Sequence, residues 1–319
     1  MLFITNREPQ GSIRTKHGRA FKFDLKKNAP SNSIYCCERI SDNEYVEIGA
    51  TPFMTKLHEC KAKQLLFYIH GFSNLPEPDI FPMTAKLQAC FDAKEKGLVL
   101  IVPIIWPCDN DIGIVKDYWD DQKSADQSAF SLARFLQKVM AWQGLASENT
   151  SCLKGINILA HSMGNRVLRE TLSVWNKYDL ENGVPLLFRV TILMAADIVN
   201  ESLEDTEEGH LISQASRNVL VYYASDDLAL RSSKIANLKN RVASRRLGHT
   251  GPEDMTKVQP NVYAIDCDRF NNKYDYPKGH TYFLNDNNDG IGMVFEHMFN
   301  AVATGCVAES DTRTRTHIL

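Results

Sequence analysis

The chain has 319 residues, of which 44% are hydrophobic and 24% are charged. These proportions are ordinary for a globular protein with one large core. The formal net charge of −3 argues against a nucleic-acid partner, because proteins that bind nucleic acids usually carry a basic surface. A single basic run, between Arg231 and Arg246, is expected to form a solvated face rather than an anion- or lipid-binding patch.

Residues 1–59 are predicted to form a strand-rich extension of the main sheet. Residues 1–8 are typical of a short strand and lack the basic start and apolar run of a signal peptide. Residues 20–25 alternate apolar and polar side chains, as a half-buried strand does. Residues 33–37 and 45–48 are weaker strand candidates.

From residue 60 onward the pattern changes to continuous apolar runs separated by helical stretches. The six runs cover residues 65–69, 98–105, 156–160, 190–196, 219–223 and 262–265. Strands that are buried on both faces have such sequences, because helices cover both sides of a parallel sheet. Apolar residues at three- and four-residue steps predict helices over 128–142, 165–175 and 291–302. The alternation predicts an α/β fold with a mostly parallel, doubly wound sheet, helices on both faces and a core over residues 60–305.

Three longer excursions interrupt this core, at residues 107–127, 198–216 and 227–259. Ligands of such sheets bind at the carboxyl ends of the strands, where these excursions begin, so the excursions are candidates for a lid or for surface loops. Residues 306–319 are expected to form a polar, disordered tail. No run approaches eighteen apolar residues, so no integral membrane segment is expected.

Ser162 carries the strongest chemical signal in the sequence. It lies between a buried strand and a helix, in Ala160-His161-Ser162-Met163-Gly164. A nucleophile elbow needs this arrangement, because its strained serine tolerates only small residues two positions before and after. Ala160 and Gly164 meet that requirement. The alternative is an ordinary serine that caps a helix after a strand.

A serine nucleophile also needs donors for the oxyanion. One amide comes from the residue after the serine, Met163, and the other from a loop after an earlier strand. The turn at His70-Gly71-Phe72 fits this second part, because Gly71 allows a sharp turn that directs the Phe72 amide at the developing charge. His70 itself is interpreted as a packing or loop-orienting histidine.

The serine further needs a base, and the base needs a carboxylate to fix its tautomer. Behind an elbow of this kind the chain order is serine, acid, histidine. His280 follows the sixth apolar run and precedes the last helix, which is the expected place for the base. The weaker candidates for the base are His161, His210, His249 and His297.

Three aspartates remain open as the acid. Asp226 and Asp227 follow the fifth run and cannot be separated by position alone, while Asp197 follows the fourth. A pair of aspartates can equally be a turn or a helix cap.

Metal and disulfide chemistry have weak signals. Residues 285–296 resemble a calcium loop but begin with Asn and precede an apolar helix, where Asp and Asn cap naturally. The eight cysteines form no CxxC pair, which predicts reduced thiols and a cytoplasmic location. We expect no cofactor and no metal.

Taken together, these motifs resemble an uncharacterised bacterial family of the α/β-hydrolase (esterase/lipase) superfamily. The similarity covers residues 60–305 and is carried by the HGF turn at 70–72, the HSMGNR elbow at 161–166, Trp106-Pro107, a D-x-A-L element at 227–230 and an H-x-Y-F element at 280–283. The resemblance implies an esterase-like activity and favours Asp227 over Asp226. The family tends to have a proline before the acid at the position of Asp197, where this chain has Ala196.

The sequence therefore predicts a serine hydrolase that cleaves a carboxylic ester or thioester of a small molecule. Ser162 is the expected nucleophile, His280 the base, Asp227 the acid, and the amides of Phe72 and Met163 the oxyanion hole. Acyl transfer by the same triad is an alternative within enzymes. A non-catalytic interaction module on the same fold is an alternative of a different class.

Overall fold

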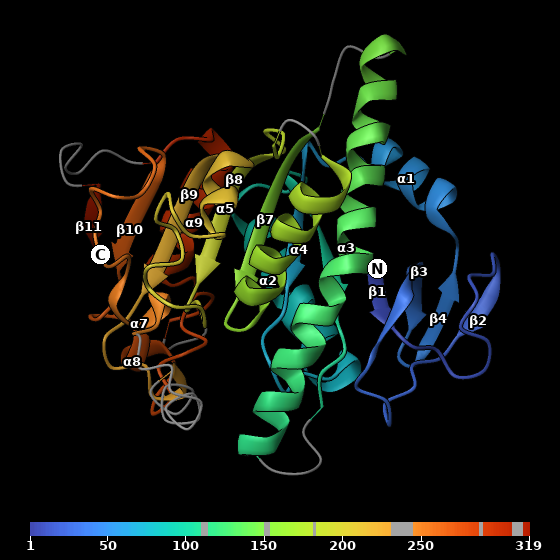
Figure 1. Ribbon diagram of the computed structural model, residues 1–319, viewed down its shortest axis with the longest axis horizontal. Helices are drawn as coiled ribbons and strands as arrows, with labels where there is room; N and C mark the ends of the chain where they lie inside the picture. The colour runs from blue at the N-terminus through green and yellow to red at the C-terminus, as the bar shows by residue number, and fades with distance from the viewer. Residues whose placement is uncertain (110–113, 150–153, 181–182, 231–244, 287–289, 308–314) are drawn as a thin grey trace. The chain divides into compact units, whose positions relative to one another are not determined.

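The computed structural model describes residues 1–109, 114–149, 154–180, 183–230, 245–286, 290–307 and 315–319. These residues form two compact units (Figure 1). Unit 1 comprises Met1–Ile156 and Glu170–Gly183, and unit 2 comprises Asn157–Arg169 and Val184–Leu319. Most of the basic run between Arg231 and Arg246 lies outside the described residues.

Unit 1 contains a mixed sheet with the strand order β5-β6-β1-β3-β4-β2. Its strands are β1 (Leu2–Arg7), β2 (Arg19–Phe21), β3 (Pro30–Ser41), β4 (Glu44–Glu47), β5 (Gln64–Ile69) and β6 (Val99–Ile105). β5, β6 and β1 run parallel, and β1, β3, β4 and β2 pair antiparallel. Because β1 pairs with β6, the N-terminal strands belong to the same sheet as the first two apolar runs.

The helices of unit 1 are α1 (Ala50–Glu59), the π-helix η1 (Pro76–Ile80), α2 (Phe81–Lys94) and α3 (Ile114–Asn149). α2 packs on β6, while α3 packs on β3 and β1. The helix predicted at 128–142 thus begins earlier, and most of the excursion at 107–127 is its first part. The sequence hid this start because the buried face of α3 there carries polar side chains, among them Asp117, Asp121 and Ser124.

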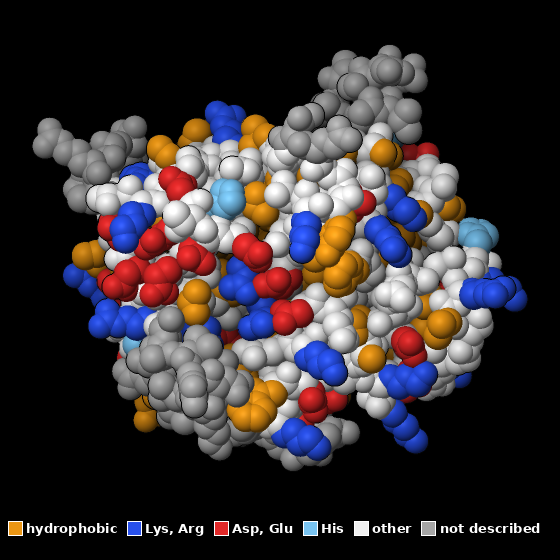
Figure 2. All heavy atoms as spheres, in the orientation of Figure 1, with side chains coloured by type: hydrophobic (Ala, Val, Ile, Leu, Met, Phe, Trp, Pro, Cys, Tyr) orange, Lys and Arg blue, Asp and Glu red, His pale blue; other side chains and the backbone are white. Residues whose placement is uncertain are grey.

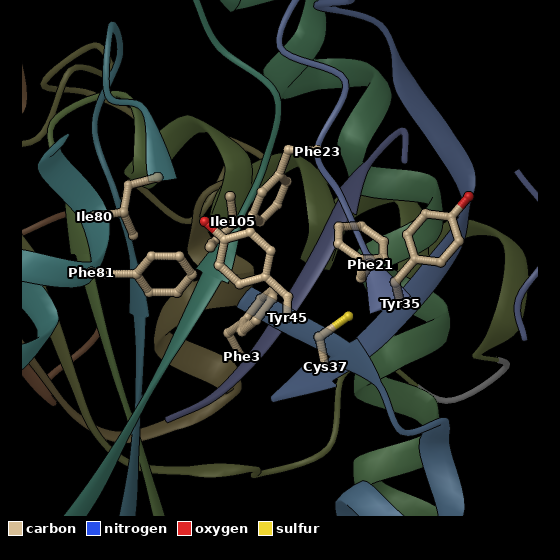
Figure 3. Packing of buried hydrophobic residues seen from close by; sticks show 9 residues of the cluster. All are labelled: Phe3, Phe21, Phe23, Tyr35, Cys37, Tyr45, Ile80, Phe81 and Ile105. Atoms are coloured by element: carbon tan, nitrogen blue, oxygen red, sulfur yellow. The ribbon is translucent and has the colours of Figure 1, made fainter. Parts of the chain in front are cut away.

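An aromatic cluster holds the N-terminal strands to the rest of unit 1 (Figure 3). The Phe3 ring lies 5.2 Å from the Phe81 ring and 5.7 Å from the Tyr45 ring, measured between centroids. Ile105 of β6 belongs to the same cluster. Burying such large apolar side chains stabilises a fold by about 1.5–3 kcal/mol for each one. The extension is therefore fixed to β6 and α2 by its own core.

Unit 2 contains a fully parallel sheet in the order β7-β8-β9-β10-β11. The strands are β7 (Gly155–His161), β8 (Phe188–Met194), β9 (Ser216–Tyr223), β10 (Val262–Asp266) and β11 (Thr316–Ile318). The first four confirm the strand positions predicted from the apolar runs. The helices are α4 (Gly164–Asp179, whose second half lies in unit 1), α5 (His210–Gln214), α7 (Leu247–Thr250), α8 (Asn271–Tyr274) and α9 (Met293–Thr304).

The end of the chain differs from the expected disordered tail. Residues 308–314 lie outside the described residues, but Thr316–Ile318 form strand β11 and pair with β10. The Arg315 guanidinium donates to the carbonyl of Val262 over 3.2 Å, which fixes the start of the strand. His317 is buried, while Ile318 is 67% exposed. A three-residue strand with one apolar side chain is too short to be predicted from hydrophobic periodicity.

Two features concern possible partners: the charged side chains on the surface and the length and apolar character of the helices. On the face drawn in Figure 2, acidic side chains gather over part of unit 2, and basic side chains lie among them. Within the described parts of the chain, no helix is both long and apolar enough to cross a membrane.

Candidate active site

Ser162 occupies a strained turn in unit 2. It sits between the end of β7 and the start of α4, with a φ of 53°. This left-handed conformation is uncommon for a residue other than glycine and costs about 1–3 kcal/mol, so it persists only where the surroundings impose it. The side chain is only 5% exposed. Its backbone N–H donates to the Met194 carbonyl at the end of β8 over 3.0 Å, which anchors the turn to the next strand.

Asn165, in the first turn of α4, holds the same serine turn through its side chain. Its Nδ2 donates to the Ala160 carbonyl over 2.9 Å and to the Ser162 carbonyl over 3.0 Å. The Asp197 amide also donates to the Ser162 carbonyl, over 3.1 Å. Sequence reasoning missed Asn165, although its fixed place directly after the elbow glycine is a signal that could have found it.

Asp227 and His280 are brought together. The His280 Nδ1–H donates to Asp227 Oδ2 over 2.6 Å. Asp227 is 0% exposed, and its other oxygen accepts the Leu230 amide over 2.9 Å. The carboxylate is thus held at both oxygens, and it fixes the His280 tautomer with the proton on Nδ1. The His280 side chain is 13% exposed, and its Nε2 makes no hydrogen bond within the described residues, with Ser162 or any other group.

Asp226 has different partners from its neighbour. Its two oxygens accept the side-chain amides of Asn271 and Asn272 in α8. Asn271 also donates to the Gly279 carbonyl over 3.4 Å, directly before His280. Asp226 therefore supports the loop that carries His280. Neither of its two hydrogen bonds involves the imidazole of His280.

The loop that carries His280 is fixed by a third aspartate. One oxygen of Asp275 accepts the His280 amide over 2.8 Å and the Thr281 amide over 2.7 Å. The Leu228 amide donates to the Lys278 carbonyl over 3.1 Å, which ties the loop to the segment that carries Asp227. These bonds set the backbone on both sides of His280. No sequence motif pointed to Asp275.

His161, the residue before the serine, contacts the predicted base. Its ring centroid lies 4.8 Å from that of His280, and its Nε2–H donates to the His280 carbonyl over 3.2 Å. The ring also lies 5.2 Å from the Phe283 ring. His161 thus connects the serine turn to the histidine loop, a role that the sequence did not suggest.

The electrostatic setting of His280 favours a proton on its ring. Burial lowers the pKa of His280, but the charge of Asp227 and its hydrogen bond raise it more, and Asp197 adds to the rise. The net pKa of His280 therefore lies above its ordinary value of 6.5. A raised pKa makes the imidazole a stronger proton acceptor once it is neutral.

Asp197 lies after β8 and is paired with a basic residue. Its Oδ1 lies 3.2 Å from Nε of Arg246, and both side chains are buried. The expectation that the whole basic run forms a solvated face is therefore wrong for Arg246. A buried arginine needs a buried partner for its charge, and Asp197 supplies one.

The two predicted oxyanion donors lie in different units. Met163 of unit 2 is fully buried, and among the described residues its amide has no hydrogen-bond acceptor. Phe72 of unit 1 follows β5, and its ring lies 5.7 Å from that of Tyr118 in α3. That the Phe72 amide is a donor in an oxyanion hole stays a prediction.

His70 is a loop-orienting residue, as expected. It is fully buried and stacks on Trp106 with ring centroids 5.1 Å apart. Its Nε2 accepts the Trp106 amide over 3.2 Å, and its Nδ1–H donates to the Gly71 carbonyl over 2.8 Å. Burial lowers the pKa of His70 to about 4, so the ring is neutral and can serve both bonds at once.

The metal candidates can be assessed only in part. Within the described ranges, no group of three or more His, Cys, Asp or Glu side chains could hold a metal ion. The segment 285–296 that resembles a calcium loop includes residues 287–289, which lie outside the described residues.

The parallel strands of unit 2, with the strained serine between β7 and α4, define the protein as an α/β hydrolase. A model of the family described as alpha/beta hydrolase of unknown function (DUF900) matches residues 49–289. The match spans more than half of the chain, and the chain belongs to this family.

The chain is also similar to two solved proteins. It is 10% identical to Est1E from Butyrivibrio proteoclasticus over 76% of this chain and 87% of that chain, with a TM-score of 0.32. It is 12% identical to phospholipase PlaB from Legionella pneumophila over 72% of this chain, with a TM-score of 0.30. The chain spans 44% of that phospholipase. Comparison with curated proteins gave no match.

Proposed function

We propose that this protein is a serine hydrolase that cleaves carboxylic esters or thioesters through an acyl-enzyme. Ser162 is the nucleophile, His280 the base and Asp227 the acid. The observation that carries the proposal is the 2.6 Å hydrogen bond from His280 Nδ1 to the buried Asp227 carboxylate. The backbone carbonyl of the same His280 accepts a hydrogen bond from His161, the residue before Ser162. A buried acid–histidine pair beside a strained serine is the arrangement that activates a hydroxyl.

The proposed mechanism has two halves. The Ser162 hydroxyl attacks the acyl carbonyl while His280 Nε2 takes its proton, and Asp227 stabilises the imidazolium that forms. His280 then gives this proton to the leaving alcohol or thiol, which leaves an acyl group on Ser162. In the second half, His280 takes a proton from water, the hydroxide attacks the acyl carbonyl, and the proton returns to Ser162.

The oxyanion of both tetrahedral intermediates is assigned to the amides of Met163 and Phe72. The open Met163 amide beside the serine supports this assignment, because a donor with no protein acceptor is available to the reacting oxygen. Loss of one such donor typically costs about 10²–10³ in kcat.

A series of p-nitrophenyl esters, from acetate to palmitate, tests the proposal. The wild-type protein should release an initial burst of nitrophenol in proportion to enzyme, followed by slower turnover. Ser162→Ala and His280→Gln should each lose at least about a thousandfold in kcat. His210→Gln is the matched control and should keep wild-type turnover. If the two triad variants turn over the esters as fast as the control, the proposal is wrong.

A further inference from the structure

His161, the residue directly before Ser162, takes no part in the proton transfers proposed above. It is 5% exposed, and its ring contacts the rings of His280 and Phe283 at centroid distances of 4.8 and 5.2 Å. Its Nε2–H donates to the main-chain carbonyl of His280 over 3.2 Å. A carbonyl oxygen has no proton to give, so this ring nitrogen carries one. His161 is therefore a buried donor to the main chain of the proposed base.

The loop that carries His280 is anchored in three ways. Asp275 accepts the His280 amide, but it lies five residues earlier in the chain and so shapes the loop internally. Asp227 accepts the imidazole Nδ1–H, which ties the loop to the segment after β9. The bond from His161 ties it to the end of β7. Of these three anchors, His161 is the one that belongs to the segment of the nucleophile, Ser162.

His161 is itself held firmly at both its main chain and its ring. As the last residue of β7 it lies opposite Met194 in the pairing with β8, and the following Ser162 amide donates to the Met194 carbonyl. Its ring packs against Phe283, which is fully buried. A group can position another only if its own place is fixed. The length of the His161 side chain therefore sets the distance between the serine turn and the main chain of His280.

The two reacting groups have no bond of their own to align them. Within the described residues, His280 Nε2 makes no hydrogen bond to Ser162. Their alignment before substrate binds thus depends on the groups that surround them, and an error of about 1 Å in such an alignment can cost a hundredfold in rate.

We infer that His161 is a positioning residue that, through its bond to the His280 carbonyl, aligns the base with Ser162. This inference rests on the proposed function, because it names the group that sets the nucleophile and the base of that site relative to each other. All of the residues involved lie in unit 2.

The test separates the donor of His161 from its ring. His161→Phe keeps a flat ring against Phe283 and removes the donor, whereas His161→Gln keeps an amide donor of similar reach and removes the ring. With p-nitrophenyl butyrate, His161→Phe should lose about tenfold to a hundredfold in kcat with KM nearly unchanged, because alignment of the base matters most in the transition state. His161→Gln should regain most of that loss.

His210 in α5 supplies the matched control. Its Nδ1–H also donates to a main-chain carbonyl, that of Glu207 over 2.5 Å, but within its own turn. His210→Phe should therefore keep the kcat of the wild type.

Proton NMR supplies a readout that does not depend on turnover. The His280 Nδ1–H, in a short bond to the Asp227 carboxylate, should give a far-downfield signal that is absent from His280→Gln. In His161→Phe this signal should broaden through faster exchange with water, whereas in His161→Gln and His210→Phe it should stay sharp. A merely structural role of His161 would lower the free energy of unfolding and leave both kcat and the signal of the folded protein unchanged.

The outcomes separate the two proposals. If wild type and His210→Phe turn over no ester of the series, the proposed function fails and the inference fails with it. If both turn over ester and His161→Phe matches them in kcat, the inference alone is wrong. A loss in His161→Gln as large as that in His280→Gln would mean that His161 itself transfers the proton, which also overturns the inference.

A shorter side chain keeps the inference testable should His161→Phe fail to fold. His161→Asn retains an amide, but its donor falls short of the His280 carbonyl, so this variant should show the same loss in kcat. Turnover of His161→Asn at the rate of the wild type overturns the inference.

Discussion

Two consecutive aspartates after β9 illustrate what a single residue position decides. Asp226 and Asp227 have the same chemistry and follow the same strand directly after one another, so position alone left them open and only the family resemblance favoured Asp227. Their partners differ because adjacent side chains point in different directions, Asp226 toward α8 and Asp227 toward His280. Such partners come from segments about fifty residues away, which local sequence cannot reveal.

Substitution of each aspartate measures this difference. Asp227→Asn should lower kcat on an accepted p-nitrophenyl ester by about 10⁴, because an amide no longer fixes the tautomer or stabilises the imidazolium. Asp226→Asn should lose less than about tenfold, since it weakens only the brace to α8. Equal losses in the two variants, or a larger loss in Asp197→Asn, would move the acid to another residue.

The pH dependence of acylation follows from the raised pKa of His280. Neutral imidazole is the active base, so the burst rate should rise with pH through a midpoint above 6.5. Asp227→Asn should lower that midpoint, because it removes the charge and hydrogen bond that raise the pKa. Stopped-flow measurement of the nitrophenol burst between pH 5 and about 9 checks both statements. A midpoint that stays in place in Asp227→Asn would contradict them.

At the scale of elements, the sequence predicts buried parallel strands well. It predicts poorly the elements that have polar side chains on a buried face or few apolar residues. Continuous apolar runs located β5 to β10 because a strand between two helical layers needs no polar face. The start of α3 was misplaced because Asp117, Asp121 and Ser124 lie on its buried face and interrupt the apolar period. Strand β11 was missed because it offers a single apolar residue. Polar groups that serve tertiary contacts therefore conceal the elements that carry them.

Asn165 should stabilise the junction of β7, β8 and α4. Asn165→Ala leaves the carbonyls of Ala160 and Ser162 without one donor and should lower the free energy of unfolding by about 1–3 kcal/mol. Urea unfolding, with the exposed Asn300→Ala on α9 as the control, measures the effect. A loss no larger than that of the control would show that the serine turn is held by other bonds.

Strand β11 should protect the edge of the sheet in unit 2. A chain that ends at residue 307 exposes the unpaired edge of β10, so it should melt several degrees lower and aggregate sooner on heating. Ile318→Ser changes an exposed side chain of β11 without removing the strand and serves as the control. Equal melting temperatures for the truncated chain and the full chain would mean that β11 contributes nothing to stability.

At the scale of the whole molecule, Asp121 makes a contribution to stability that should fall as pH rises toward neutrality. Asp121 binds its proton more tightly in the folded protein than in the unfolded chain, with a pKa of about 7 against 3.8. Its contribution is therefore full below the lower value and is lost as pH rises through the higher one. His280, whose pKa is also raised, acts in the same direction at higher pH.

Urea unfolding at a series of pH values tests this dependence. Between pH values of about 4 and 8, the free energy of unfolding of the wild type relative to that of Asp121→Asn should fall by roughly 3 kcal/mol. The comparison uses the change with pH, so a constant loss from the substitution does not affect it. Parallel curves for the two proteins would contradict the raised pKa of Asp121.

Over the whole chain, local motifs predicted the proposed reacting residues better than the residues that hold them in place. Ser162, Asp227 and His280 could be proposed from strand ends and chain order, because each follows an apolar run. Asn165 and Asp275 could not, because their hydrogen bonds lie at turns without a motif. The residues that react are easier to predict than the residues that hold them.

The central claim is that Ser162 is an activated nucleophile. A fluorophosphonate probe tests it most directly, since it reacts only with a serine that a base has activated. Incubation with folded protein, followed by intact mass and peptide mapping, should show one adduct, located on Ser162. Ser162→Ala should take up no probe, whereas the exposed Ser12→Ala should label like the wild type. Absence of any adduct on folded wild-type protein, or equal labelling of Ser162→Ala, would contradict the account.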